Sequence, residues 1–146
     1  MNDFSKLMKT IGYRFKNLNL LKIALTHSSF SLDAKKINFE RLEFLGDRVL
    51  GLIISEEIFR KFSKETEGEL AKRFSFLVCK KTLIKIASNV KIDNYILISP
   101  DVGTSSLKSI TANSLEALIA AIFLDSDFEI TRKIVINMWK EFLKKN

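Results

Sequence analysis

The sequence predicts an all-α protein. Apolar residues recur every three to four positions along most of the 146-residue chain, and the strict alternation typical of strands is nearly absent. The chain has one Pro and five Gly, which excludes collagen-like and linker-like classes. The length favours a single domain, which we expect to span residues 1–146.

The expected helices follow this periodicity in order. Regularly spaced leucines predict a short amphipathic helix over 18–27, and residues 31–37 follow as a loop. A long helix is expected from about Asn38, which is a suitable N-cap, to about Phe62.

In the second half of the chain, Gly68 marks a turn or the start of a helix. Residues 91–106 contain Asn, Pro, Asp and Gly and predict a loop, with a short extended piece at Tyr95–Ile98. The remaining helices are expected over four stretches: 70–77, 83–87, Leu107–Leu124 and Glu129–Lys144.

The charge balance favours a polyanionic partner. There are 24 Lys and Arg against 17 Asp and Glu, a formal net charge of +7. Nucleic acid is the obvious partner of such a chain, although a Lys-rich surface that serves only solubility explains the same excess.

The chain has a single cysteine and a single histidine, which excludes several kinds of site. Cys79 and His27 are the only Cys and His, so an internal disulfide and a Cys- or His-based zinc site are excluded. The longest uncharged apolar run, Ala117–Leu124, is too short to span a bilayer, and the N-terminus has no secretory pattern. We therefore expect a cytoplasmic protein with no membrane partner.

Three acids share one face of the long helix, spaced by three and four residues: Glu40, Glu43 and Asp47. Like charges in this arrangement repel, and their neighbours are among the most apolar in the chain. Gly46 in the same helix costs about 1 kcal/mol relative to Ala, which indicates that another backbone passes close to it. Neutralisation by Arg41 and Arg48 is the alternative explanation for the acids.

A second helix also carries oxygen ligands. Glu116 is the only acid of its helix, Asn113 lies one turn earlier on the same face, and the residues that follow are apolar. An unpaired buried carboxylate is expensive. Two such helices predict a divalent-metal site, and oxygen ligands favour Mg²⁺ or Mn²⁺ over zinc. A metal held by acids on a basic chain suits phosphodiester chemistry.

The stretch Asn38–Leu50 reads NFERLEFLGDRVL and resembles the signature helix of the ribonuclease III family, NERLEFLGDxVL. Other segments resemble family motifs in the same order: LTHSS at 25–29, TEGEL at 66–70, and ANSLEALI at 112–119, continued at 123–125. The resemblance covers nearly the whole chain. It implies an all-helical endonuclease domain that forms a homodimer and cuts double-stranded RNA with Mg²⁺, in RNA processing.

The resemblance also implies roles for individual residues. Four positions match the family's metal ligands: Glu43, Asp47, Asn113 and Glu116, of which Asp47 and Glu116 are the catalytic pair. Three more match positions at the dimer: Glu40 and Glu67 at the cleft, and Phe44, which enters the partner subunit. His27 is expected to be structural rather than a ligand.

Two departures from the family pattern affect the expected function. The family has Asp where this chain has Asn113, and a neutral amide should weaken divalent binding and impair cleavage. Family members usually continue into a double-stranded-RNA-binding domain, which is not part of this chain, so RNA affinity should come from the basic face and be salt-sensitive. Lys108, near the acidic helix, is one candidate RNA contact.

Three functions stay open. The chain is an active magnesium-dependent endonuclease, a dimeric RNA-binding or scaffold protein that has lost turnover through Asn113, or a helical interaction domain without an RNA role. The signature helix makes the last of these the least favoured.

Overall fold

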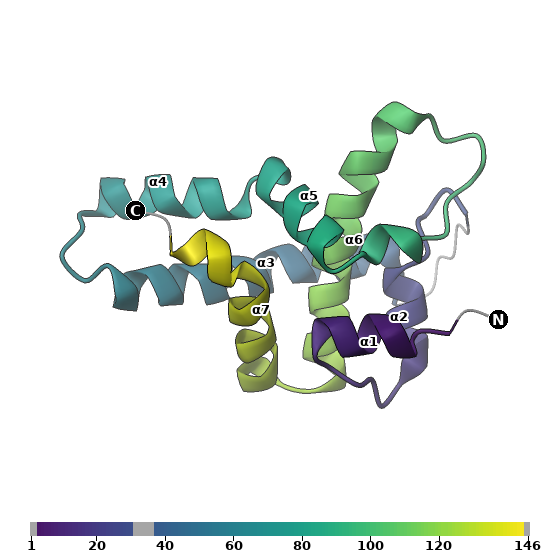
Figure 1. Cartoon of the computed structure of the whole chain (residues 1–146), viewed down its shortest axis with the longest axis horizontal. Coiled ribbons are helices and arrows are strands. Elements are labelled where there is room, and N and C mark those ends of the chain that lie inside the picture. The colour runs from purple at the N-terminus through teal and green to yellow at the C-terminus, as the bar shows by residue number, and fades with distance from the viewer. Residues whose placement is uncertain (1–2, 31–36, 145–146) are drawn as a thin grey trace.

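The computed structural model describes residues 3–30 and 37–144 and confirms the all-α prediction (Figure 1). Its elements are α1 (Ser5–Ile11), α2 (Leu18–Ala24), α3 (Phe39–Lys61), α4 (Glu67–Val78), α5 (Lys80–Asn89), the 3₁₀ helix η1 (Ile92–Asn94), α6 (Thr104–Asp125) and α7 (Phe128–Leu143).

The centre of the fold is α6, which packs against α2, α3, α5 and α7. Figure 1 shows it running through the middle of the molecule and across α3. Every residue from Leu115 to Ile122 is buried. By length and composition alone, α6 could cross a membrane, but a core helix has the same composition and most of its apolar stretch is buried here.

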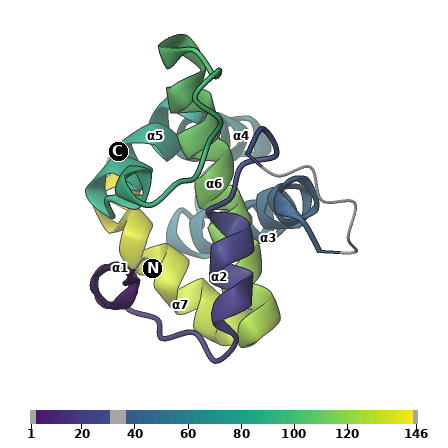
Figure 2. The same ribbon diagram turned by 90° about the vertical axis from the view of Figure 1, so that its right-hand side faces the viewer.

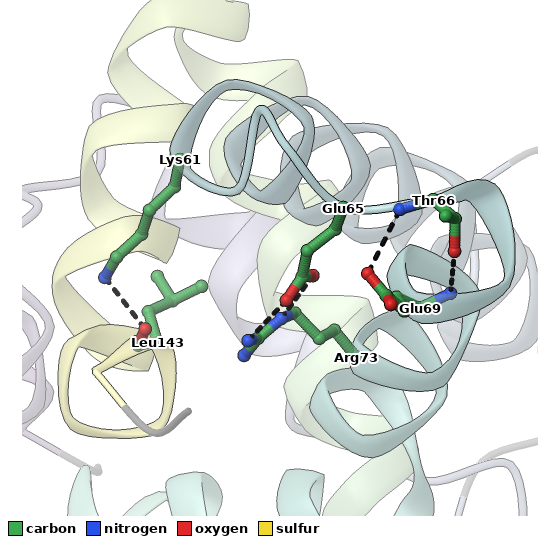
Figure 3. Close-up of polar contacts among 6 residues, drawn as sticks. All are labelled: Lys61, Glu65, Thr66, Glu69, Arg73 and Leu143. Carbon is green, nitrogen blue, oxygen red and sulfur yellow. Dashed lines mark hydrogen bonds and ion pairs between the residues drawn. The ribbon is translucent and has the colours of Figure 1, made fainter.

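The turn between α3 and α4 is held by two polar contacts, drawn in Figure 3. Thr66 and Glu69 form a capping box, in which each side chain accepts the backbone N–H of the other residue. The Arg73 guanidinium donates to both carboxylate oxygens of Glu65, at 2.6 and 2.7 Å, and lies over the ring of Phe62. The start of α4 is therefore fixed relative to the end of α3.

Two further contacts hold α7 against the earlier helices. The buried Trp139 donates from Nε1 to the Leu77 carbonyl at 2.8 Å. Lys61, at the end of α3, donates from Nζ to the Leu143 carbonyl at the end of α7, also at 2.8 Å (Figure 3). That bond satisfies a carbonyl that has no partner within its own helix.

The C-terminal end of α6 is attached to the α1–α2 loop through Asp125. Its carboxylate accepts the Tyr13 hydroxyl at 2.6 Å and the amides of Lys16 and Asn17 at 2.7 and 2.9 Å. Burial alone would raise the pKa of Asp125, but these donors outweigh it and hold the pKa below its usual range.

The predicted helix over 18–27 is wrong in its last three residues, because α2 ends at Ala24. Thr26 instead forms an isolated parallel β-bridge with Leu97, and the His27 amide bonds to the Leu97 carbonyl. A partner 71 residues away in the sequence thus draws this backbone out of the helix.

Other boundaries also differ from the prediction. The expected loop over 91–106 contains η1, and α6 begins three residues earlier than predicted, at Thr104 rather than Leu107. The extended piece expected at 95–98 is reduced to the bridge at Leu97. The structure adds α1, which the sequence analysis missed. Of the loop expected over 31–37, residues 31–36 lie outside the described part of the chain.

Candidate functional site

The two acid-bearing helices touch through their backbones at Gly46. A Cβ atom built on Gly46 would overlap the carbonyl carbon and oxygen of Glu116. The prediction that another backbone passes close to this glycine is therefore confirmed. The contact places Glu43 and Asp47, which flank Gly46 on α3, beside Glu116 on α6.

Glu116 is the buried acid of the site. Only 8% of the residue is exposed, against 57% of the Asp47 side chain, while Glu43 is half-buried. The expectation that the acids lie in apolar surroundings is right for Glu116 and wrong for Asp47 and Glu40, which face solvent.

The electrostatics show how closely the three carboxyl groups interact. Burial, a hydrogen bond with Asp47, and the negative charges of Asp47 and Glu43 raise the pKa of Glu116 to about 8, against a smaller opposite effect of Arg48. Burial and the charges of Glu40 and Asp47 raise the pKa of Glu43. With its pKa raised to about 8, Glu116 carries a proton near neutral pH in the protein without metal.

Arg48 neutralises part of this charge, as the alternative explanation anticipated. Its Nη1 lies 3.3 Å from Asp47 Oδ2, and its guanidinium stacks 4.0 Å from the ring centroid of Phe44. The pair is exposed, so it contributes little stability. The lowering effect of Arg48 on the pKa of Glu116 is smaller than the opposite effects of burial, Asp47 and Glu43.

The donor set fits a hard divalent ion in its chemistry. Glu43, Asp47 and Glu116 supply carboxylate oxygens, and the half-buried Asn113 lies one turn before Glu116 on α6. Mutual repulsion among the acids is what a cation would relieve. Within residues 3–30 and 37–144, no three acidic, His or Cys side chains already enclose a site of ionic size. Ion binding would therefore require the side chains to close together.

Glu67 does not join this group. It is the first residue of α4, beyond the far end of α3, whereas Asp47 lies near the middle of α3 (Figure 1). With a rise of 1.5 Å per residue, the two positions are separated by roughly 20 Å along α3. Within one chain, Glu67 faces solvent at a helix N-terminus, where a carboxylate is favourable in any case.

Phe44 lies on the outer face of α3, with 62% of its surface exposed. It borders a groove of about 660 Å³ that is lined mainly by apolar residues. The lining residues are Ile37, Glu40, Arg41, Leu42, Phe44, Leu45 and Leu124. Leu124 comes from the end of α6, 80 residues away, so no local pattern could have placed it there.

Two more large apolar residues are exposed along the same helix. Leu52 is 61% and Phe59 is 70% exposed. Together with Leu45 they are spaced by seven residues, which places them on one stripe of α3. This heptad spacing was the signal available in the sequence.

Comparison with known proteins gives consistent results. Residues 17–142 match a family model described as Ribonuclease-III-like. Ribonuclease 3 of Rickettsia conorii is 45% identical over 99% of this chain, and that of Ehrlichia canis is 44% identical over 92% of it. The chain spans 66% and 61% of the length of these two relatives.

Two solved structures of the nuclease domain of ribonuclease III from Campylobacter jejuni are also similar. Both superpose with a TM-score of 0.89 at 40% identity, over 98% and 100% of this chain and 100% and 99% of theirs. For one of these two structures, structural flexibility is described in the region of the Campylobacter jejuni domain that is involved in dimer formation.

Proposed function

The chain belongs to the ribonuclease III family, and we propose that it forms the part of such an enzyme that cuts double-stranded RNA with a divalent ion held between α3 and α6. The observation that carries the proposal is the backbone contact of Gly46 with Glu116, since it brings Glu43 and Asp47 beside Glu116. The proposed setting is the cytoplasm.

Four residues would hold the ion: Glu43, Asp47, Asn113 and Glu116. Mg²⁺ suits these oxygen donors, and Mn²⁺ is the alternative. When bound, such an ion lowers the pKa of a water molecule and stabilises charge on the leaving oxygen. Before that, Glu116 must release the proton that it shares with Asp47, so ion binding should strengthen as the pH rises towards about 8.

In this proposal, Asn113 determines how fast the site cleaves RNA. An amide offers one neutral carbonyl oxygen where a carboxylate would add a charge. Cleavage of plain duplex RNA should therefore be weak in the chain with Asn113 and rise by a large factor in Asn113→Asp, with the fold unchanged. Glu116→Gln is the matched loss variant on the same helix. If neither change alters magnesium-dependent cleavage, these residues are not the metal site.

The second candidate function, an RNA-binding or scaffold protein of the same fold, is favoured by the same neutral residue. The two functions differ in turnover and not in binding. A chain that binds duplex RNA, but cleaves it neither with Asn113 nor as Asn113→Asp, would support the scaffold function and contradict the nuclease.

We further propose that two copies pair through the outer face of α3. The apolar stripe of the partly buried Leu45 and the exposed Leu52 and Phe59 runs along the helix beside Phe44 and its groove. Large apolar residues exposed in a row mark an interaction surface. In a two-fold dimer the same surface serves both copies, so a stripe centred on Leu52 places that residue at the axis and Leu45 beside the partner's Phe59.

Pairing of this kind gives Phe44 and Glu67 their expected roles. Phe44 would enter a hollow on the partner subunit, and antiparallel α3 helices would bring the partner's Glu67 towards the Glu40 end of this chain. A clean monomer in sedimentation at micromolar concentration, or a Phe44→Ala protein that stays equally dimeric, contradicts the dimer.

Disulfide cross-linking tests the position of the axis separately. In a Cys79→Ser background, Leu52→Cys should cross-link to its own copy, because two residues on the axis lie close enough for a disulfide. Phe76→Cys, at another exposed apolar position, on α4, is the control and should not cross-link. If the protein is dimeric but Leu52→Cys does not cross-link, the proposed position of the two-fold axis is wrong and the proposed dimer still stands.

RNA should lie against the basic surface near the N-terminal half of α6. Lys108 is exposed there, and Lys80 of α5 donates to Ser109, the residue that follows Lys108 on α6. Contacts to phosphates and 2′-hydroxyls make binding fall steeply with salt and favour RNA over DNA duplexes. Binding that is insensitive to salt, or equal for duplex DNA, contradicts this part of the proposal.

A further inference from the structure

The turn that follows α2 is held by a hydrogen-bonded network around His27. The His27 amide donates to the Leu97 carbonyl at 2.9 Å, and the Leu97 amide donates to the Leu25 carbonyl at 2.7 Å. The Ser29 amide donates to His27 Nδ1 at 3.1 Å, and the Ser99 amide donates to Ser29 Oγ at 3.1 Å. The turn is thereby joined to the segment that leads into α6, which passes the end of α2 in Figure 2.

The directions of these bonds fix the protonation of the ring. A backbone N–H can only donate, so His27 Nδ1 is an acceptor and the ring proton is on Nε2. Ser29 Oγ lies 2.8 Å from the same Nδ1, to which it donates its hydroxyl proton while accepting the Ser99 amide. A protonated imidazole would turn an N–H towards the Ser29 amide, and that bond would be lost.

The imidazole also contacts the start of α3. Its ring packs edge-on against the buried Phe39, with the centroids 5.2 Å apart and the planes at 73°. Burial lowers the pKa of His27, against a smaller opposite effect of the Glu40 charge. No Asp, Glu, Lys or Arg occurs in 25–30 or 95–100, the two stretches that the network joins.

We propose that His27 is a positioning residue. As the neutral imidazole, it connects the beginning of α3 to the segment that leads into α6, and it thereby sets the relative position of the two acid-bearing helices where they cross. The proposal concerns the protein without metal or RNA. It therefore holds or fails independently of the cleavage reaction.

Amide hydrogen exchange measured by NMR, from about pH 5 to about 7.5, tests the proposal on the full chain. Protection of the His27 and Leu97 amides should fall about fivefold as the ring becomes protonated, the factor expected for one net hydrogen bond. The raised pKa of Glu116, about 8, changes the global stability smoothly over this range, and the change appears equally in a core amide that reports only global opening. Nitrogen chemical shifts at neutral pH should place the ring proton on Nε2.

Two variants separate the acceptor from the ring. His27→Asn keeps an oxygen acceptor close to the position of Nδ1 but cannot be protonated, so it should retain protection with a flat pH profile. His27→Phe keeps the contact with Phe39 without an acceptor, so protection should be low at every pH. The amide of Leu118, buried in α6, is the internal control.

Two results would overturn the proposal: a ring proton found on Nδ1, or a pH profile of the natural chain that matches that of His27→Asn. Where His27→Phe fails to fold, the comparison of the natural chain with His27→Asn decides alone.

Discussion

Replacing Gly46 by Ala tests the helix crossing on which the site depends. In an open helix interior, Gly→Ala gains about 1 kcal/mol. At Gly46 the new Cβ would overlap backbone atoms of Glu116, which cannot rotate away as a side chain can, so α3 and α6 must separate. Overpacking of this kind costs typically about 1–3 kcal/mol, occasionally more. The net expectation is a loss of up to about 2 kcal/mol in the free energy of unfolding.

Gly51 of the same helix provides the matched control. A Cβ there would lie 3.6 Å from the Phe74 ring, an ordinary contact, so Gly51→Ala should be neutral or stabilise by up to about 1 kcal/mol. Urea unfolding followed by circular dichroism measures both variants. A Gly46→Ala protein as stable as Gly51→Ala would refute the close crossing and, with it, the geometry of the site.

The remaining predictions concern pH. Glu116 binds its proton more tightly in the folded state, with a pKa of about 8 against an ordinary value of 4.5, so the metal-free protein should lose stability as the pH rises between these values; Glu116→Gln should remove this dependence in urea titrations at several pH values. Asp125 has the opposite effect: its lowered pKa contributes stability above the ordinary value of 3.8, and this stability is lost on acidification. Asp125→Asn should therefore cost about 1–2 kcal/mol of unfolding free energy near neutral pH. It should also reduce the fall of the thermal unfolding temperature at acidic pH.

The sequence predicted the core of the site because its signals are local. Gly46 in a helix interior indicated a close backbone, and a lone acid among apolar residues indicated that Glu116 is buried; both are confirmed. The exposure of Asp47 was not predictable in the same way. It depends on how much of the surface of α3 is covered by α6, and the spacing of residues within one helix does not predict that.

What the sequence could not supply are the contacts between distant segments. Asp125 binds residues 108 and 112 positions away, and neither its neighbours nor its spacing distinguishes it from a solvated acid. Thr26 leaves the helical pattern for the same reason, because its partner Leu97 is remote. By contrast, α1 was predictable, since Leu7, Met8 and Ile11 already have helical spacing.

The position of α6 in the chain bears on how the protein is made. This 22-residue helix is apolar enough to be held by a membrane or to aggregate if it is left uncovered. Among the described helices that pack against it, α2, α3 and α5 precede it in the sequence and α7 follows. Because synthesis runs from the N-terminus, most of the covering surface already exists when α6 leaves the ribosome. The order of the helices thus shortens the time for which the most apolar segment of the chain is exposed.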